Sequence, residues 1–236
     1  MQLDQILRTL AAGRRQATHE LVAAVLREAI TTGQLKANQP LPQDEIASQL
    51  RVSHIPVREA LRQLQSEGLV DYQPNRGATV SALEPAEISE IYEIRAILET
   101  AAIRQAVPLT PAQLVRARAI LDQAEQVADG ATWGSLDVEF HQLMYDLGRR
   151  PQLGEMIAGL LRRVDRYWLV HGLMLKYRDE FEREHRALLA ALERGDAEGA
   201  AELLQRHLAG ASRRLVAELA AGHSATGAVA QETAAR

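Results

Sequence analysis

Four side chains in the C-terminal half of the chain have the types and the spacing of a metal site. Asp137 and His141 are four residues apart in LDVEFHQLM, so on a helix they share one face. His185 and His207 flank Gly195 at separations of ten and twelve residues. Because a helix rises about 1.5 Å per residue, both imidazoles would lie at nearly the same height of a helical hairpin that turns at Gly195. The alternative is three unrelated histidines on half-buried helix faces.

Three imidazoles and one carboxylate form a donor set that suits Zn²⁺, with Mn²⁺, Ni²⁺ or Fe²⁺ as alternatives where waters complete the coordination. A metal-dependent hydrolase would use the same ligands, but it also needs a general base. Glu139 and Glu184 are the nearby carboxylates, and neither stands in a catalytic spacing such as H-E-x-x-H. We therefore predict a divalent metal and no enzymatic activity.

Arg95 interrupts an apolar stripe that recurs at helical spacing. The stripe consists of Ile88, Ile91, Leu98 and Ala102. An arginine on an inward face must find an anion or extend to water, and its planar fork suits a carboxylate. We predict that Arg95 binds a small carboxylate effector. The alternative is an internal salt bridge, for instance to Glu99.

The stretch 52–70, VSHIPVREALRQLQSEGLV, is typical of a short helix that reads DNA. Ser53 can cap its first turn, and Gly68 ends it. Apolar residues at helical spacing form a dry face: Val57, Leu61 and Leu64. Arg58 and Arg62 lie on another face, where they can contact base edges and phosphates in a major groove. The alternative is an ordinary surface helix with solvated arginines.

The neighbouring segments place this stretch in a winged helix-turn-helix. Residues 18–32 and 43–50 have helical patterns, and residues 69–72 and 78–80 are β runs around a turn at 73–77. Three helices followed by a β-hairpin in about sixty residues are typical of that DNA-binding fold.

The remaining chain is expected to form an antiparallel, all-α helical bundle of six helices with short connections. We therefore predict a mostly α protein with a small β-hairpin wing. Five segments follow: an N-terminal extension (1–17), the DNA-binding domain (18–80), a linker (81–85), the helical effector and metal domain (86–221) and a disordered tail (222–236).

Composition narrows the class of protein further. The chain of 236 residues has no cysteine, which excludes disulfides and thiolate metal sites. No secretory signal or membrane-length apolar run is visible, so we expect a cytoplasmic protein without membrane contact. The net charge is +1 over residues 1–80 and −5 over residues 81–236. DNA binding must therefore depend on a few well-placed charges.

The segments LREAITTGQL, DEIASQLRVSHIPVREALRQLQSEGLV and NRGATV closely resemble the N-terminal domain of GntR-type bacterial transcription regulators. The resemblance covers residues 18–80 and implies a homodimer that binds a short palindrome in double-stranded DNA. It also implies DNA contacts from the start of the recognition helix and from the wing tip. The matching positions are Ser53, His54, Ile55, Arg58, Arg62, Arg76 and Gly77.

Two positions depart from this family's pattern. Arginine is usual where this chain has His54, and a basic residue is frequent where it has Asp44. Histidine can donate a hydrogen bond but lacks the bidentate reach of a guanidinium to guanine. We therefore expect a different operator or a weaker affinity.

The second half, with D-x-x-x-H, EH-x-x-L and HL, resembles the FCD ligand-binding domain of the FadR branch of these regulators. The resemblance implies a divalent metal held by Asp137, His141, His185 and His207, with a small carboxylate beside it. Arg95 also matches a position that lines the effector pocket in this family. We predict a repressor controlled by a small organic acid. A regulator that responds to the metal itself is the alternative.

Overall fold

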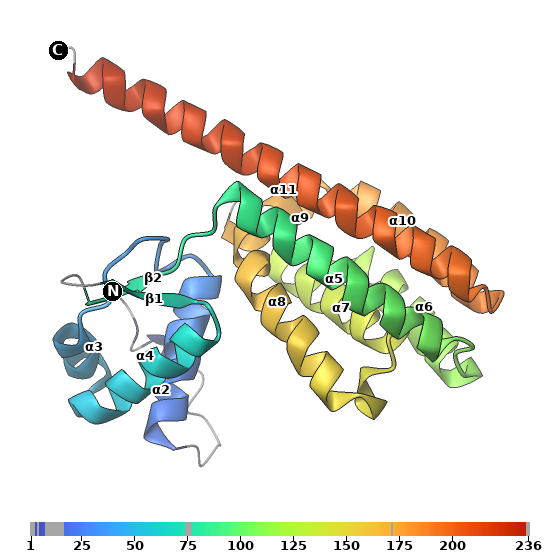
Figure 1. Cartoon of the computed structure of the whole chain (residues 1–236), viewed down its shortest axis with the longest axis horizontal. Coiled ribbons are helices and arrows are strands. Elements are labelled where there is room, and N and C mark those ends of the chain that lie inside the picture. The colour runs from blue at the N-terminus through green and yellow to red at the C-terminus, as the bar shows by residue number, and fades with distance from the viewer. Residues whose placement is uncertain (1–2, 4, 8–16, 74–76, 171, 235–236) are drawn as a thin grey trace. The chain divides into compact units, whose positions relative to one another are not determined.

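The computed structural model describes residues 3, 5–7, 17–73, 77–170 and 172–234. The described residues are mostly helical and contain one two-stranded sheet (Figure 1), as the sequence predicts. The chain divides into two compact units. The first unit contains residues 1–83 and 161–170, and the second contains residues 84–160 and 171–236.

The first unit contains a tight helix-turn-helix. Its three helices are α2 (Thr18–Thr31), α3 (Gln43–Leu50) and α4 (His54–Ser66). The turn from α3 to α4 passes through Arg51, whose positive φ of 55° reverses the chain within a few residues. Ser53 occupies the N-cap position of α4, although its hydroxyl makes no capping hydrogen bond. Gly68 ends the turn after α4 with a φ of 70°, a value that a residue with a Cβ adopts only with strain.

The wing is a β-hairpin of β1 (Val70–Gln73) and β2 (Gly77–Val80). The strands are antiparallel, and Val70 pairs with Val80. The segment before α3 extends this sheet, because Leu41 N–H donates to Ala78 O at 2.8 Å and Val80 N–H donates to Gln39 O at 2.9 Å. These residues are held in place by long-range pairing with β2.

Aliphatic side chains fill the core of the first unit. Val25, Leu26, Ile46 and Leu61 are all fully buried. Leu3 and Ile6 also belong to this core, although the sequence analysis expected little from residues 1–17. Their spacing of three residues is the helical pattern that buries one face.

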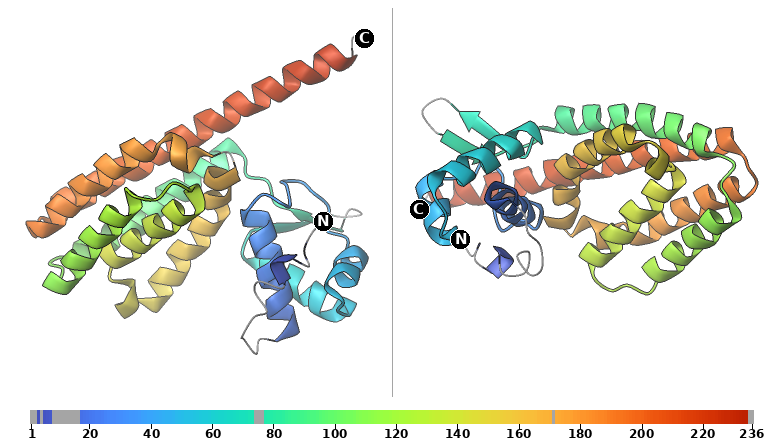
Figure 2. Two further views of the ribbon diagram at one scale, coloured as in Figure 1. Left: turned by 180° about the vertical axis from the view of Figure 1, so that it is seen from behind. Right: turned by 90° about the horizontal axis from the view of Figure 1, so that it is seen from below.

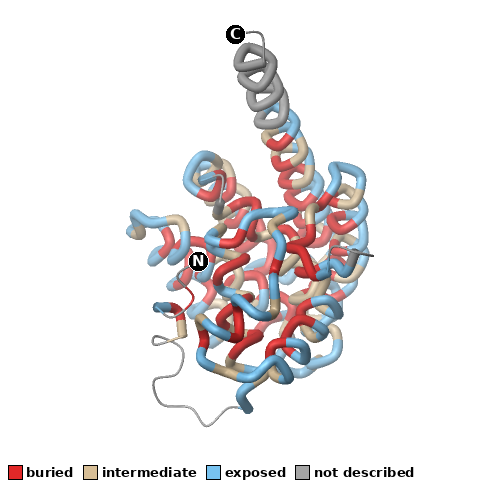
Figure 3. Tube along the Cα trace, turned by 90° about the vertical axis from the view of Figure 1, so that its left-hand side faces the viewer, coloured by how far each residue is buried: buried red, intermediate tan, exposed pale blue. Residues whose placement is uncertain are grey.

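The second unit is built from helices alone among its described residues (Figure 2). They are α5 (Pro85–Ala106), α6 (Pro111–Ala124), α7 (Gly130–Met144), η1 (Leu147–Arg149), the first half of α8 (Pro151–Val170), α9 (Leu173–Lys176), α10 (Arg178–Glu193) and α11 (Ala197–Ala234). Helix α11 packs along α5, and Gly195, with a φ of 67°, turns α10 into α11. Buried positions recur along α11 at helical spacing (Figure 3).

Local sequence explains the start of α7 and the length of α11. Helix α6 ends at Ala124, and α7 begins at Gly130. Asp129 explains that start, because its Oδ1 accepts a hydrogen bond from Thr132 N–H at 2.8 Å. Helix α11 continues to Ala234, whereas the sequence analysis ended the bundle at residue 221 and expected disorder beyond it. This last segment is rich in alanine and contains no proline, which favours helix.

Candidate functional site

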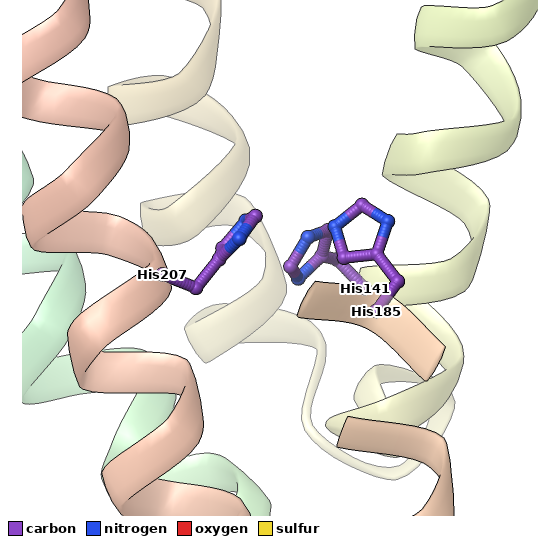
Figure 4. Close-up of side chains that lie close together, drawn as sticks. All are labelled: His141, His185 and His207. Atoms are coloured by element: carbon purple, nitrogen blue, oxygen red, sulfur yellow. The ribbon is translucent and has the colours of Figure 1, made fainter. Parts of the chain in front are cut away.

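The structure brings the four expected metal ligands together in the second unit. Asp137 and His141 lie on α7, His185 on α10 and His207 on α11, and the three imidazoles face one another (Figure 4). One ring nitrogen from each histidine lies within 4.8 Å of the other two. Asp137 Oδ1 lies 3.3 Å from His185 Nε2 and 3.7 Å from His141 Nε2. His185 and His207, at matched heights on the α10–α11 hairpin, therefore converge with His141 and Asp137 in one cluster.

The cluster is buried behind aromatic side chains. His141, His185 and His207 are 4%, 1% and 6% exposed. Both phenylalanines of the chain pack against the imidazole rings. The centroid-to-centroid distance is 5.2 Å from Phe140 to His185 and 5.5 Å from Phe181 to His207.

Trp133 adds a further wall and stacks on His185 at 6.3 Å. We did not predict this enclosure from the sequence. Phe140 directly precedes His141, Phe181 stands one helical turn before His185, and Trp133 stands two turns before His141. In a chain with only 4% aromatic residues, that concentration was the available clue.

Burial favours the neutral form of two of these imidazoles, those of His141 and His185. It lowers the pKa of His141 and of His185 well below the ordinary value of 6.5, and the neighbouring imidazoles strengthen the shift. A metal binds the neutral ring, so the protonation state suits coordination.

A second layer of hydrogen bonds surrounds the histidines. The Tyr145 hydroxyl lies 2.8 Å from His141 Nδ1 and donates to Glu99 Oε2 at 2.6 Å. On the other side, Glu184 Oε2 lies 2.6 Å from His207 Nδ1. Arg214 Nη2 donates to Glu184 Oε1 at 2.7 Å. Residue types and spacing did not predict Tyr145 or Glu99 at the metal site, and they indicated Glu184 only as a candidate catalytic base.

Two pKa values reflect these contacts. Burial raises the pKa of Tyr145 well above 10.0, and the Glu99 carboxylate adds to this shift. Burial also acts to raise the pKa of Glu184, but the hydrogen bonds from His207 and Arg214 outweigh it and lower the value. The tyrosine therefore stays protonated at neutral pH, and the glutamate stays ionised.

Arg95 is 5% exposed and forms the internal ion pair that the sequence left open as an alternative. Its Nε donates to Glu99 Oε1 at 2.7 Å, and its guanidinium lies 4.7 Å from the centre of the Tyr92 ring. Glu99 thus joins Arg95 to Tyr145 in one buried network. Effector binding by Arg95 stays a prediction.

The donor set fits a divalent cation by its own geometry. His185 Nε2 is buried and makes no hydrogen bond within the described part of the chain, although Asp137 Oδ1 lies 3.3 Å away. A buried polar atom without a hydrogen bond is costly, and three imidazoles plus a carboxylate are suitable ligands for Zn²⁺. A cavity of about 10 Å³ beside Asp137, His185 and Trp133 has the size of one water molecule.

The expected DNA-contacting residues lie at the start of α4 in the first unit. Ser53, His54 and Arg58 are exposed, as is Arg62 one turn further on. Ile55 is 59% exposed despite its apolar side chain. The opposite face of α4 is fully buried, since Val57, Leu61 and Leu64 have no accessible surface.

The two positions that depart from the GntR pattern are neighbours in space. His54 Nδ1 lies 3.2 Å from Asp44 Oδ1, and both side chains are largely exposed. At the wing, Gly77 has a φ of 72° and is exposed, whereas Arg76 lies outside the described residues.

A helix-turn-helix unit with a wing and a separate helical unit define a class of DNA-binding transcriptional regulators. Comparison with protein families agrees. Residues 18–80 match the family of bacterial regulatory proteins named gntR, and residues 90–210 match the FCD domain. The chain therefore belongs to the GntR family of transcriptional regulators and carries an FCD domain.

Individual relatives support this assignment. The transcriptional regulator McbR of Escherichia coli K12 is 32% identical over 202 residues, which cover 78% of this chain and 88% of that protein. The repressor RspR of the same strain is 26% identical over 200 residues, covering 82% and 86% of the two chains. The solved structure of E. coli McbR/YncC matches with a TM-score of 0.71 and 28% identity, over 86% of this chain and 99% of that one.

These relatives are transcriptional regulators and not enzymes, in agreement with the sequence prediction. The contacts of the two carboxylates considered as catalytic bases also fit this conclusion. Glu184 is bonded to His207 and Arg214, and Glu139 is paired with Arg116. Among the described residues, no helix combines the length and the apolar character needed to cross a bilayer.

Proposed function

We propose that this GntR-family regulator is a homodimeric repressor of the FadR subfamily. A small carboxylate, bound beside a divalent metal in the FCD domain, controls its affinity for a palindromic operator. The observation that carries the proposal is the convergence of the Asp137 carboxylate with three buried histidines.

Asp137, His141, His185 and His207 would hold the metal. Zn²⁺ suits this donor set best, and Mn²⁺, Ni²⁺ or Fe²⁺ are the alternatives. When bound, the cation supplies a Lewis-acidic centre to which a carboxylate can bind. Each histidine comes to the site from a packed helix, so the ligands are largely positioned before the metal arrives.

Arg95 is the proposed partner for the acid because its guanidinium is buried and already holds a carboxylate, that of Glu99. The cavity beside Asp137 and His185 is too small, at about 10 Å³, for an organic acid. Binding of an acid therefore requires side chains or helices to move. A ligand that binds one arrangement better than another shifts the population toward it, which is the physical basis for control of DNA binding.

The DNA-binding half of the proposal depends on the start of α4 and the wing. Ser53, His54, Ile55, Arg58 and Arg62 present an exposed surface on a helix whose other face is fixed in the core. Arg76 and Gly77 at the wing tip complete the proposed contacts. A homodimer would present two such helices to the two halves of a palindrome.

Thermal unfolding of the metal-loaded protein with a panel of small carboxylates tests the proposal. An effector at a hundred times its dissociation constant should stabilise the folded protein by about 2.7 kcal/mol. The shift should disappear after chelation, and the same acid should release an operator fragment.

A regulator that responds to the metal itself is the second candidate. The contacts of Arg95 favour this second candidate, because its guanidinium already interacts with Glu99 and Tyr92. In that case chelation would change both the melting temperature and operator affinity, while no acid in the panel would change either.

A further inference from the structure

The hydrogen-bond partner of His207 shows which of its ring nitrogens carries the hydrogen. Glu184 lies between His207 Nδ1, at 2.6 Å, and Arg214 Nη2, at 2.7 Å. A carboxylate paired with a guanidinium accepts hydrogen bonds and donates none. His207 must therefore carry a hydrogen on Nδ1, and in the neutral, metal-binding ring the lone pair is then on Nε2.

The same conclusion holds for His141 by a different route. The Tyr145 hydroxyl has one hydrogen, and it donates this hydrogen to Glu99 Oε2 at 2.6 Å. Toward His141 Nδ1, at 2.8 Å, the hydroxyl oxygen can then only accept. His141 therefore also carries its hydrogen on Nδ1, and its Nε2 lone pair points toward Asp137 and the other rings.

These two tautomers place potential metal-ligating atoms close together. With these tautomers, the Nε2 lone pairs of His141 and His207 belong to the same cluster as the buried His185 Nε2 and the Asp137 carboxylate. We propose that Glu184 and Tyr145 are positioning residues of the metal site, and that each fixes the tautomer and the orientation of one histidine ligand. This inference rests on the metal site of the proposed function.

The two positioning groups, Glu184 with Arg214 and Tyr145 with Glu99 and Arg95, have similar components but contact their histidines differently. Each contains a carboxylate that an arginine neutralises, Arg214 for Glu184 and Arg95 for Glu99. Glu184 contacts its histidine directly and has a side chain that is 31% exposed. Glu99, with a side chain that is 1% exposed, acts through Tyr145. A substitution at Glu184 is therefore the cleaner test, since it leaves no fully buried group without a partner.

Metal affinity of the full chain is the property to measure. Zn²⁺ is titrated into chelator-treated protein in competition with a chromophoric chelator, and Co²⁺ absorption reports the coordination. The variants are Glu184→Gln and Tyr145→Phe, with Glu193→Gln as the matched control. Glu193 lies on the same helix as Glu184 and is also paired with an arginine, Arg118, but it contacts none of the histidines in the described structure.

Loss of such an outer partner typically weakens metal affinity about 10- to 100-fold. We expect losses in this range for Glu184→Gln and Tyr145→Phe, a changed Co²⁺ spectrum for both, and an affinity within twofold of wild type for Glu193→Gln. Unfolding of each metal-free variant identifies any loss of folding separately.

The titration can contradict the positioning role and the metal site separately. If wild type binds Zn²⁺ and folded Glu184→Gln binds it equally well with an unchanged Co²⁺ spectrum, the positioning role is wrong while the metal site stands. If the wild-type protein binds neither Zn²⁺ nor Co²⁺ at millimolar concentration, the metal site of the proposed function is wrong.

Discussion

The helix-turn-helix of the first unit and the histidine cluster of the second unit bury different kinds of side chain. In the first unit, the buried positions of α2, α3 and α4 are all aliphatic, and those expected DNA contacts that the structure describes lie on the surface. In the second unit, Arg95, Glu99 and the three histidines are at most 6% exposed. The first unit therefore keeps function apart from its core, whereas the second builds its candidate site inside the core.

This contrast has a consequence for mutations. A surface residue of the first unit can change DNA affinity without changing stability, because it contributes little to packing. A residue of the buried cluster in the second unit affects stability and ligand binding together, because its partners lose their contacts in the same step. Four predictions test this difference, from the largest expected effect to the smallest.

Two substitutions in the single helix α4 should separate folding from DNA binding. Leu61→Ala removes a fully buried side chain and should lower the free energy of unfolding by about 2–5 kcal/mol. Ile55→Ala, at a position that is 59% exposed, should change it by less than about 0.5 kcal/mol while weakening operator binding. Chemical unfolding and a DNA-binding titration measure both. A stability loss of equal size for the two variants would contradict the contrast.

Metal addition should stabilise the second unit. In Trp168→Phe, Trp133 is the remaining tryptophan and reports on that unit, since it stacks on His185. Zn²⁺ at a hundred times its dissociation constant should raise the free energy of unfolding by about 2.7 kcal/mol. The control is His185→Ala in the same background, which should show no such gain. A gain that persists in the control would place the ion elsewhere.

Arg58→Ala should weaken operator binding by about 1–3 kcal/mol if the side chain reads a base, or lower the salt-dependence slope by about 1 if it contacts a phosphate. Arg118→Ala is the matched control, because Arg118 is an exposed arginine of the second unit. Operator titrations at several salt concentrations distinguish the two roles. Equal slopes and affinities for wild type and Arg58→Ala would remove Arg58 from the interface.

The ion pair between Arg27 and Glu67 should give the first unit a pH-dependent stability. Burial acts to raise the pKa of Glu67, but hydrogen bonds from Arg27, at 2.8 and 2.6 Å, outweigh it and lower the value below 4.5. Because the folded-state pKa is lowered, the ionised carboxylate stabilises the fold above the unfolded pKa. This stabilisation is lost as the pH falls through the folded pKa.

Glu67→Gln should therefore cost about 1 kcal/mol at pH 7. The difference from wild type should shrink when urea unfolding is repeated near pH 3. A constant difference across this range would show that the charge of Glu67 does not contribute.

Local patterns in the sequence predicted the parts that depend on residues close together in the chain. The apolar spacing of Val57, Leu61 and Leu64 and the stop at Gly68 predicted α4, and the turn at Gly195 placed His185 and His207 level with each other. Such features follow from helical periodicity and backbone conformation, which are set within a few residues.

Contacts between distant segments were decided only by the tertiary structure. Tyr145 reaches Glu99 across 46 positions, Glu184 meets His207 across 23, and Leu3 enters a core formed by later helices. The sequence alone determined the family, the helix faces and the four candidate ligands. Folding determined which nitrogen of His141 and His207 faces the cluster, because a tautomer depends on hydrogen-bond partners that helical spacing does not specify.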